Sequence, residues 1–311
     1  MYYILDDEKN NFRKEIDIMK SLREIIDILN FRGYLRFVSD EVWLRYKYKQ
    51  IYHKELDLNN PKTFNEKMQW MKLNYKNPIC TSMVDKIEAK NYINNILGGG
   101  YTIPTLGVWN SFDEIDWDSL PSQFVLKCNH DSGGLVICRD KSKLDMKAAK
   151  RKISKCLNTN YFWHGREWVY KNIKPRILAE KYMENNGSEQ LSDYKFYCFN
   201  GVPKCLYVST GLEDHNKARI GFYDLNFEKL PFSRTDYLPF DNNPQKPEHF
   251  NEMIHIAEKL SEGFPFLRVD LYEINGKIFF SELTFIPCSG WMTLEPEEWD
   301  FILGSWLELP N

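Results

Sequence analysis

The chain has 311 residues, and its 41 lysines and arginines nearly balance its 44 aspartates and glutamates. This length allows one large domain or two modest ones. A charge balance this close to zero argues against a nucleic-acid binder. Seven cysteines without a CxxC pair argue against a disulfide framework and a structural zinc site, and favour the cytoplasm. The chain has neither a signal-peptide pattern nor an apolar run of about 18 residues, so we expect no transmembrane segment.

The first 75 or so residues predict a helical segment. Apolar side chains recur at three- and four-residue spacings over residues 19–37 and 42–56. A further helix is expected after Asn60-Pro61, because Thr63 can cap its first turn and Glu66 completes a capping box. Basic and aromatic residues alternate over 45–52, which favours a solvated helix with its aromatic side chains packed inward. A surface for a glycan is the alternative.

From about residue 80 onward the pattern predicts an α+β (mixed α/β) fold. A helix over 83–96 ends at three consecutive glycines. Asn275-Gly276 predicts a tight hairpin between the last two strands. Because strand hairpins alternate with helices, a doubly wound parallel sheet is excluded. Strands are expected at residues 105–109, 123–128, 134–140, 176–183, 193–201, 203–210, 218–226, 266–274 and 277–285, and helices at 145–157, 247–263 and 297–309.

The last hairpin carries a candidate metal site. Strand alternation places Arg268, Asp270 and Tyr272 on one face, and Glu282 and Thr284 share a face of the second strand. Asp270 and Glu282 lie nearly equidistant from the turn, so we expect them to be cross-strand or diagonal neighbours, about 5–8 Å apart. A hard cation such as Mg²⁺ would relieve their repulsion. The alternative is that Asp270 pairs with Arg268 or a lysine and that Glu282 faces solvent.

A second candidate site follows the strand at 123–128. Lys127 can reach nucleotide phosphates as a point charge. Glycine has no Cβ, so the loop after this lysine can approach phosphates through its backbone N–H groups. The stretch matches neither GxxxxGK[ST] nor GxGxxG. The candidate residues of this loop are His130, Ser132, Gly133 and Gly134.

A third candidate site spans two strands and the polar loop between them. The strand at 176–183 ends in Glu180, Lys181, Tyr182 and Met183, and the next strand carries Asp193 and Lys195. Such a hinge can present backbone groups to an adenine and a carboxylate to a ribose. Taken alone, the stretch is better explained as an ordinary hairpin with charged surface residues.

The order of these three pieces resembles the ATP-grasp superfamily, in which two α+β subdomains clamp Mg-ATP between them. The resemblance implies that Lys127 and the 132–134 loop grip the phosphates. It also implies that Lys86, earlier in the chain, reaches the phosphates, and that residues 180–183 form the adenine hinge. Asp193 then lies where a ribose-binding acid is usual.

The same resemblance assigns Asp270 and Glu282 as the carboxylates that hold Mg²⁺. The superfamily often has an asparagine two residues after the second carboxylate, where this chain has Thr284. This departure bears on the coordination of a second metal ion. The resemblance places an N-terminal helical segment at residues 1–75 and an ATP-grasp domain at 76–311. Within that domain it places a nucleotide subdomain at about 101–183 and a metal and substrate subdomain at about 184–300.

A narrower resemblance covers nearly the whole chain. The stretches NPKTFNEKMQWMKL, VDKIEAKNYI, FVLKCNHDSGG, GREWVYKNIKPRILAEKYM, DYKFYCFNG and RVDLYEINGKIFFSELTFIPCSG together resemble the TupA-like ATP-grasp family. That family is associated with bacterial surface polysaccharides, including teichuronopeptide and capsule. The resemblance implies an ATP-dependent ligase that joins a carboxylate, such as a uronic acid of a glycan, to an amino acid or small amine. ATP-grasp proteins are often dimers, and a polysaccharide-assembly partner is a further expectation.

In such a ligase we expect Lys127 and Arg268 to act on the transferred phosphoryl group. For Arg268 the alternative is a structural ion pair with Asp270. His164, Arg166 and Arg219 could bind a substrate carboxylate, and Trp163 could stack on a sugar or simply pack. Two other functions stay open: a glycosyltransferase, to which the DWD at 116–118 would belong, and an ATP-grasp kinase acting on a small molecule.

Overall fold

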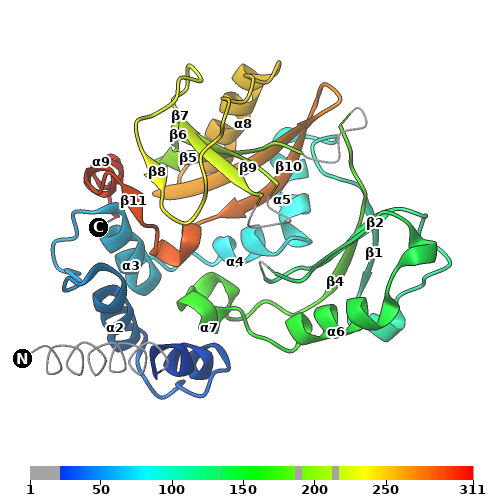
Figure 1. The fold of residues 1–311 in the computed structure, drawn as a ribbon, viewed down its shortest axis with the longest axis horizontal. Coiled ribbons are helices and arrows are strands. Elements are labelled where there is room, and N and C mark those ends of the chain that lie inside the picture. Colours follow the sequence, from blue (N-terminus) through cyan, green and yellow to red (C-terminus); the bar gives the residue numbers. More distant parts are fainter. Residues whose placement is uncertain (1–21, 132, 186–190, 212–216, 311) are drawn as a thin grey trace, which may run out of the picture.

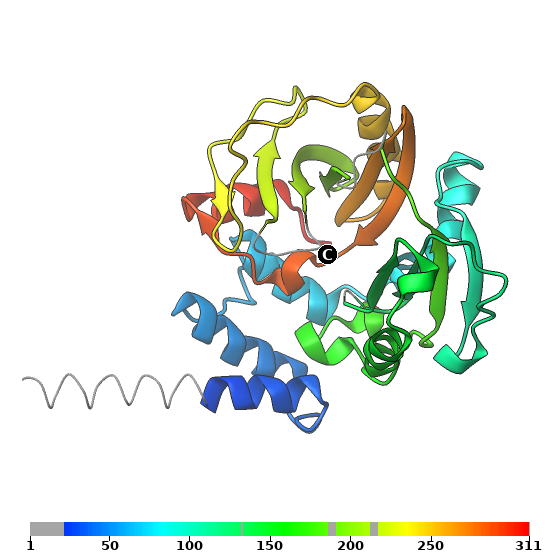
Figure 2. The ribbon, with the colours of Figure 1, turned by 45° about the vertical axis from the view of Figure 1, so that its right-hand side comes forward.

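Two antiparallel sheets carry the fold, with helices α4 (Ile79–Val84) and α5 (Glu88–Leu97) between them (Figures 1 and 2). The computed structural model describes residues 22–131, 133–185, 191–211 and 217–310. The large sheet has the strand order β10-β9-β5-β6-β7, and the small sheet has the order β1-β4-β2-β3. The strands are β1 (Thr105–Trp109), β2 (Phe124–Cys128), β3 (Leu135–Cys138), β4 (Ile177–Lys181), β5 (Asp193–Phe199), β6 (Val202–Thr210), β7 (Arg219–Tyr223), β9 (Phe266–Ile274) and β10 (Lys277–Thr284), with β8 (Ser233–Arg234) and β11 (Leu294–Glu295) paired separately.

Helices pack on both faces of the large sheet, and one helix packs on the small sheet. The other helices are α2 (Asp40–Tyr52), α3 (Phe64–Asn74), α6 (Met146–Leu157), α7 (Phe162–Gly165), α8 (Phe250–Ser261) and α9 (Glu298–Trp306), with a helix over 22–31 and short 3-10 turns at Phe112–Glu114, Lys141–Lys143, Trp168–Tyr170 and Pro287–Gly290. Phe250 of α8 packs on Phe196 of β5, with ring centroids 5.8 Å apart. Since side chains alternate along a strand, α8 covers the face opposite Lys195. No described helix is long and apolar enough to cross a membrane.

The β9–β10 hairpin forms as the sequence predicts, and one irregularity sets its register. Asn275 and Gly276 both have positive φ, 51° and 71°, which suits these two residue types in a tight turn. The register shifts between Phe280 and Glu282, so a β-bulge absorbs the extra residue on β10. Asp270 therefore lies directly opposite Glu282. This confirms the expected cross-strand neighbours.

The helix expected over 83–96 is broken, which corrects the sequence prediction. Asp85 ends α4 in an extended conformation, and its carboxylate accepts hydrogen bonds from the backbone N–H groups of Ile87 and Glu88, the second at 3.4 Å. A local side-chain cap of this kind competes with helix continuation. The break turns Lys86 toward the loop after β2, where its N–H donates to the carbonyl of Asn129 at 3.0 Å.

Three apolar cores divide the described chain. The first lies between the large sheet, α8, α9 and α3–α5, and α3 contributes Phe64, Met68 and Met71 at helical spacing. The second lies between the small sheet and α6 and includes Leu126 and Ile153. The third contains Trp43, Leu44 and Tyr48 of α2 and Leu56 of the following loop, so these aromatic side chains of α2 pack inward as expected. The boundaries at 75, 101 and 183 stay predictions, and α3 packs with the large sheet across the first of them.

The chain ends close to the capped start of α3, where Gly304 of α9 lies against the backbone of Lys62 and Thr63. A Cβ at Gly304 would come within 2.2 Å of the Lys62 carbonyl oxygen. We expect Gly304→Ala to lower the free energy of unfolding by about 1–3 kcal/mol through overpacking, measured by chemical denaturation. Ser305→Ala, at the exposed next position, should stay within about 0.5 kcal/mol of wild type. A stabilising Gly304→Ala change, as expected for a helical glycine in open space, would contradict this packing.

Candidate functional site

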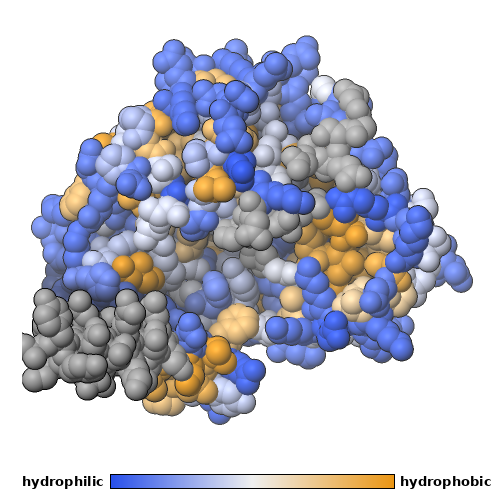
Figure 3. Space-filling view, viewed as in Figure 1, coloured by the Kyte–Doolittle hydropathy of each residue, from blue (hydrophilic) through white to orange (hydrophobic). Residues whose placement is uncertain are grey.

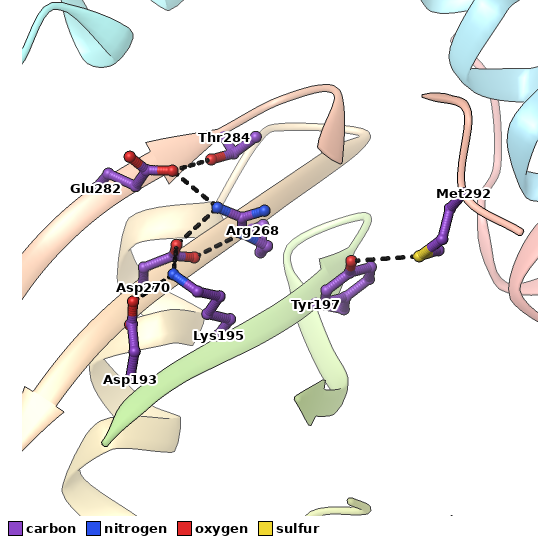
Figure 4. Close-up of polar contacts among 8 residues, drawn as sticks. All are labelled: Asp193, Lys195, Tyr197, Arg268, Asp270, Glu282, Thr284 and Met292. Carbon is purple, nitrogen blue, oxygen red and sulfur yellow. Dashed lines mark hydrogen bonds and ion pairs between the residues drawn. The ribbon is translucent and has the colours of Figure 1, made fainter. Parts of the chain in front are cut away.

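A ladder of largely buried charged side chains crosses the face of the large sheet opposite α8 (Figure 4). Glu282 of β10, Asp270 of β9 and Lys195 of β5 are register partners on three neighbouring strands. Two residues away along each strand, Thr284 is the register partner of Arg268, and Arg268 is the register partner of Tyr197. Register partners point to the same face of a sheet, so the pleat brings these charges together.

Arg268 links the two carboxylates of the ladder. Its Nε donates to Asp270 Oδ1 at 2.7 Å and its Nη2 donates to Asp270 Oδ2 at 2.6 Å. The same Nη2 donates to Glu282 Oε1 at 2.8 Å. The ion pair that the sequence left open for Arg268 is therefore present. Its remaining nitrogen, Nη1, donates to no described residue, so this arginine keeps a donor for a ligand.

Asp270 is fully buried (0% exposed) and is neutralised from two sides. Besides Arg268, it accepts a 2.5 Å hydrogen bond from Lys195 Nζ, which donates equally closely to Asp193. Burial alone would lower the pKa of Lys195, but Asp193 and Asp270 raise it well above its ordinary value. Burial raises the pKa of Asp193 to about 6 against the opposing effect of Lys195. Asp193 Oδ1 and the neighbouring Ser209 Oγ are buried without a described partner.

Glu282 is the accessible member of the carboxylate pair, with 36% of its side chain exposed. Burial by itself would raise its pKa, but Arg268, Lys86 and Lys195 outweigh that effect and hold the pKa at about 2. Thr284 adds a 3.1 Å hydrogen bond to Oε1. The carboxylate is therefore ionised at any physiological pH. Its other oxygen, Oε2, accepts no hydrogen bond from the described residues.

A second charged group lies on the small sheet. Glu180 of β4 accepts from Lys127 of β2 at 2.7 Å and from Lys90 of α5 at 2.5 Å. Burial would lower the pKa of Lys127, but Glu180 raises it, with further contributions from Tyr272 and Glu282 of the large sheet. Lys127 thus lies within electrostatic reach of the hairpin on the other sheet.

The loop after β2 is held by the helix break. Lys86 Nζ donates to the carbonyl oxygen of Asp131, and Asn129 donates to Asp85 at 2.8 Å. Gly133 is exposed, whereas Gly134 packs so closely on Cys128 that a Cβ would lie 2.8 Å from the thiol sulfur. His130 is buried, with Nε2 3.0 Å from the Thr159 carbonyl oxygen and Nδ1 unpartnered among the described residues. Ser132 lies outside the described residues.

The expected adenine hinge lies at the end of β4. Glu180 contributes its backbone to the sheet between β1 and β2, while its side chain is occupied by the two lysines. Lys181 is exposed, and its N–H donates to the Pro104 carbonyl at 3.0 Å. Tyr182 and Met183 are half-buried just beyond the strand. The hinge roles of residues 180–183 stay predictions.

The oxygen donors of the hairpin fit a hard divalent cation. Asp270 and Glu282 offer carboxylates on adjacent strands, and Glu282 has a free, accessible oxygen. Carboxylate oxygens are the ligands that Mg²⁺ prefers, together with water and nucleotide phosphates. In this structure Arg268 and Lys195 supply the positive charge that Asp270 requires. The hydroxyl of Thr284 lies beside Glu282 but is a weaker donor than the expected asparagine.

The four candidate substrate residues do not form one site, and Arg166 needs a correction. Arg166 is 2% exposed, and its guanidinium donates to the side chains of Asn30 and Asp40 and to the carbonyl oxygens of Leu35 and Val38. It anchors the N-terminal helices, so it is not available to a substrate carboxylate. Trp163 lies over that guanidinium at 4.6 Å, and His164 stacks on Tyr161 at 5.3 Å. Arg219 lies away from them, on edge strand β7, where it donates to the carbonyls of Lys217 and Ala218.

Sequence reasoning missed two groups near this site. Lys90 follows Lys86 by four residues, a spacing that could have suggested two lysines serving one site. The second group is a buried pair, Lys72 and Glu167. Lys72 Nζ donates to the Ser289 carbonyl at 2.6 Å, and Ser289 Oγ donates to Glu167 at 2.5 Å. No local signal marks this pair, because its members meet only through the turn that follows β10.

Comparison with known proteins places the fold. A family model described as TupA-like ATPgrasp matches residues 66–308. No curated protein matches the chain. Solved structures similar to it include D-alanine–D-alanine ligase from Bacillus anthracis complexed with ATP, with 15% identity over 66% of this chain and 54% of that chain and a TM-score of 0.38. D-alanine–D-alanine ligase from Helicobacter pylori has 16% identity over 73% of this chain and 61% of that chain, with a TM-score of 0.39. A RimK domain ATP-grasp protein from Sphaerobacter thermophilus has 12% identity over 73% of this chain and 69% of that chain, with a TM-score of 0.38.

The family match confirms the expected TupA-like ATP-grasp family and its mixed α+β ATP-grasp fold. It also places the chain among the ATP-grasp enzymes. The chain spans 54% and 61% of the lengths of the two D-alanine–D-alanine ligases. The TM-scores are below 0.4, and it is the family match that assigns this chain to its family.

Because the pKa of Glu282 is low, we expect this side chain to contribute to the loss of stability in acid. The pKa is about 2 in the folded chain against an ordinary 4.5, so the ionised side chain stabilises the fold above pH 4.5. That stabilisation is lost as the pH falls from 4.5 toward about 2. We expect the difference in unfolding free energy between wild type and Glu282→Gln to be constant near neutral pH and to shrink below pH 4.5.

Denaturant unfolding at a series of pH values measures this difference. Glu262→Gln, at an exposed position at the end of α8, is the matched control and should show no such dependence. A wild-type to Glu282→Gln difference that keeps its size down to pH 3 would mean that Glu282 is not held by the surrounding cations.

Proposed function

This chain belongs to the TupA-like ATP-grasp family, and we propose that it is a carboxylate–amine ligase that works through an acyl phosphate. The observation that carries the proposal is the convergence of two lysines on a carboxylate hairpin. Lys86 and Lys127 both act electrostatically on Glu282, although they come from the helix break and the small sheet. A nucleotide phosphate chain with its metal needs cations and carboxylates on opposite sides.

Lys127 and Lys86 would bind the nucleotide phosphates. Both lie beside the loop that contains Gly133, whose exposed backbone can approach an anion closely. Glu180 holds Lys127 in place, so the lysine would need little reorganisation to bind a phosphate. His130 would orient the loop through Thr159. Residues 180–183 would bind the adenine, and Asp193, with its unpartnered buried Oδ1, would face the ribose.

Glu282 and Asp270, with Thr284 beside them, would hold Mg²⁺. Bound there, the ion would neutralise charge on the nucleotide phosphates. Lys195 donates to Asp270 at 2.5 Å, and Arg268 bridges the two carboxylates. The chain's own residues thus prearrange the oxygens for the ion.

The chemistry joins an acid to an amine in two displacements. A carboxylate oxygen of the substrate attacks the γ-phosphorus of ATP, and the bond to ADP breaks. The amine nitrogen then attacks the acyl carbon, phosphate leaves, and the nitrogen loses a proton to form the amide. Lys127 and the free Nη1 of Arg268 stabilise charge on the transferred phosphoryl group and on the acyl oxygen. Exclusion of water protects the acyl phosphate from hydrolysis.

The proposed substrate is a uronic-acid carboxylate of a capsular or teichuronic-type polysaccharide, or of its precursor. The amine is an amino acid or another small amine. The protein would act in the bacterial cytoplasm, as a homodimer or with a polysaccharide-assembly partner. The association of the TupA-like family with surface polysaccharides supports this substrate class. Trp163, His164 and Arg219 stay candidate contacts, whereas Arg166 does not.

The glycosyltransferase alternative is less well supported. Trp117 of the DWD stretch packs on Phe112 and Phe124 in the small-sheet core, and Asp116 accepts from the Ser119 N–H at 3.4 Å. Neither aspartate belongs to the charged groups around Glu282. The kinase alternative shares the nucleotide site and differs only in the fate of the phosphoryl group.

Hydroxylamine trapping tests the ligase proposal. With Mg-ATP, a uronic acid and hydroxylamine as the amine, we expect ADP and a hydroxamate in equal amounts. Lys127→Ala should lower kcat/KM by about 10²–10³-fold, because it removes charge stabilisation from the transferred phosphoryl group. Lys147→Ala, at an exposed position of α6, is the matched control and should leave the rate unchanged. ADP release without hydroxamate would favour the kinase, and turnover of a UDP-sugar alone would favour the glycosyltransferase.

A further inference from the structure

A cluster of two thiols and a carboxylate lies at the base of the loop after β2. Cys128 ends β2, Cys156 lies in the last turn of α6, and Asp131 follows in the loop. The three ligand atoms, two Sγ and a carboxylate oxygen, all lie within 4.8 Å of one another. Their spacing along the chain gives no metal motif, and only the packing of α6 on the small sheet brings them together.

The Asp131 carboxylate has no protein partner among the described residues. The residue is 9% exposed, and its carboxylate accepts no hydrogen bond and forms no ion pair with a described residue. Lys86 contacts the backbone carbonyl of Asp131 instead of its side chain. The carboxylate oxygens are not among the fully buried side-chain atoms that lack a partner, so they remain open to a cation.

The two thiols decide what kind of cation fits. Thiolate ligands select soft or borderline ions such as Zn²⁺, whereas Mg²⁺ and Ca²⁺ take oxygen ligands. Cys128 is 1% exposed and contacts the Ile153 carbonyl oxygen at 3.8 Å as well as the side chain of Cys156, so it is poorly placed for reaction with an oxidant. Cys156 and Asp131 are more accessible and give an ion a way in.

We propose that Cys128, Cys156 and Asp131 bind a thiophilic divalent cation of the Zn²⁺ class. On binding, each thiol releases one proton to solvent and the carboxylate coordinates as it stands, so two protons are lost per ion. Three protein ligands leave the fourth tetrahedral position to water or to another group. The proposal does not depend on the substrate or reaction proposed above.

Such an ion would tie the phosphate loop to the small sheet. Gly134 packs directly on Cys128, and Lys86 holds Asp131 through its carbonyl oxygen. A bound cation would fix both ends of this short loop to α6 through Cys156. The segment that carries Gly133 would then be anchored at its base while its tip stays exposed. The ion therefore has a positioning role and does not contact the reacting atoms.

Cobalt substitution provides a direct test on the reduced, untagged full chain. Co²⁺ bound by thiolates gives an intense near-ultraviolet charge-transfer band, which oxygen and nitrogen ligands do not give. We expect wild type to bind one Co²⁺ with this band, displaced by one equivalent of Zn²⁺. The second ligand cluster of the described chain, Glu248, His249 and Glu273, has no thiol and cannot give the band.

Three variants make the test specific. Cys156→Ser and Asp131→Asn change little volume at accessible positions, so they should fold and should weaken Co²⁺ binding by at least tenfold. Cys138→Ser changes a buried cysteine of the same sheet that lies outside the cluster, and it should keep the band. The proposal is overturned if wild type shows no thiolate band, if Cys156→Ser retains it, or if Cys138→Ser loses it.

Discussion

The neutralisation of one buried carboxylate organises the large sheet. Asp270 is out of contact with water, and Arg268 and Lys195 approach it at 2.5–2.7 Å. Removing one partner of such a group leaves a buried charge uncompensated, which is strongly destabilising. The same arginine holds Glu282, and the same lysine holds Asp193. Five charged side chains on three strands are therefore linked through this one carboxylate.

The second constraint is that the two sheets share their charges. Lys127 belongs to the small sheet. Burial lowers its pKa, whereas Glu180 of the same sheet and, to a smaller extent, Glu282 of the large sheet raise it. Lys86 reaches the same carboxylate from the break between α4 and α5. An ATP-grasp enzyme has to bring cations for phosphate and oxygens for metal to one nucleotide. In this chain the short helices between the sheets make that approach possible.

Local patterns predicted the strands and the candidate ladder well. Alternation and the Asn275-Gly276 turn were sufficient to bring Asp270 opposite Glu282, although the bulge that completes the register leaves no sequence signal. The helix break at Asp85 was missed because side-chain capping overrides an uninterrupted apolar period. Arg166 was misread because a guanidinium bound by distant backbone carbonyls looks, in sequence, like one free to bind a substrate. Lys72 and Glu167 meet only through tertiary packing.

A double-mutant cycle would show whether both sheets bind one Mg-ATP. Calorimetry would measure Mg-ATP binding to wild type, Lys127→Ala, Glu282→Gln and the double variant. If Lys127 and Glu282 serve the same nucleotide, their effects should couple by about 0.5–3 kcal/mol. Strictly additive losses, or unchanged affinity in either single variant, would show that the two sheets do not converge on one ligand.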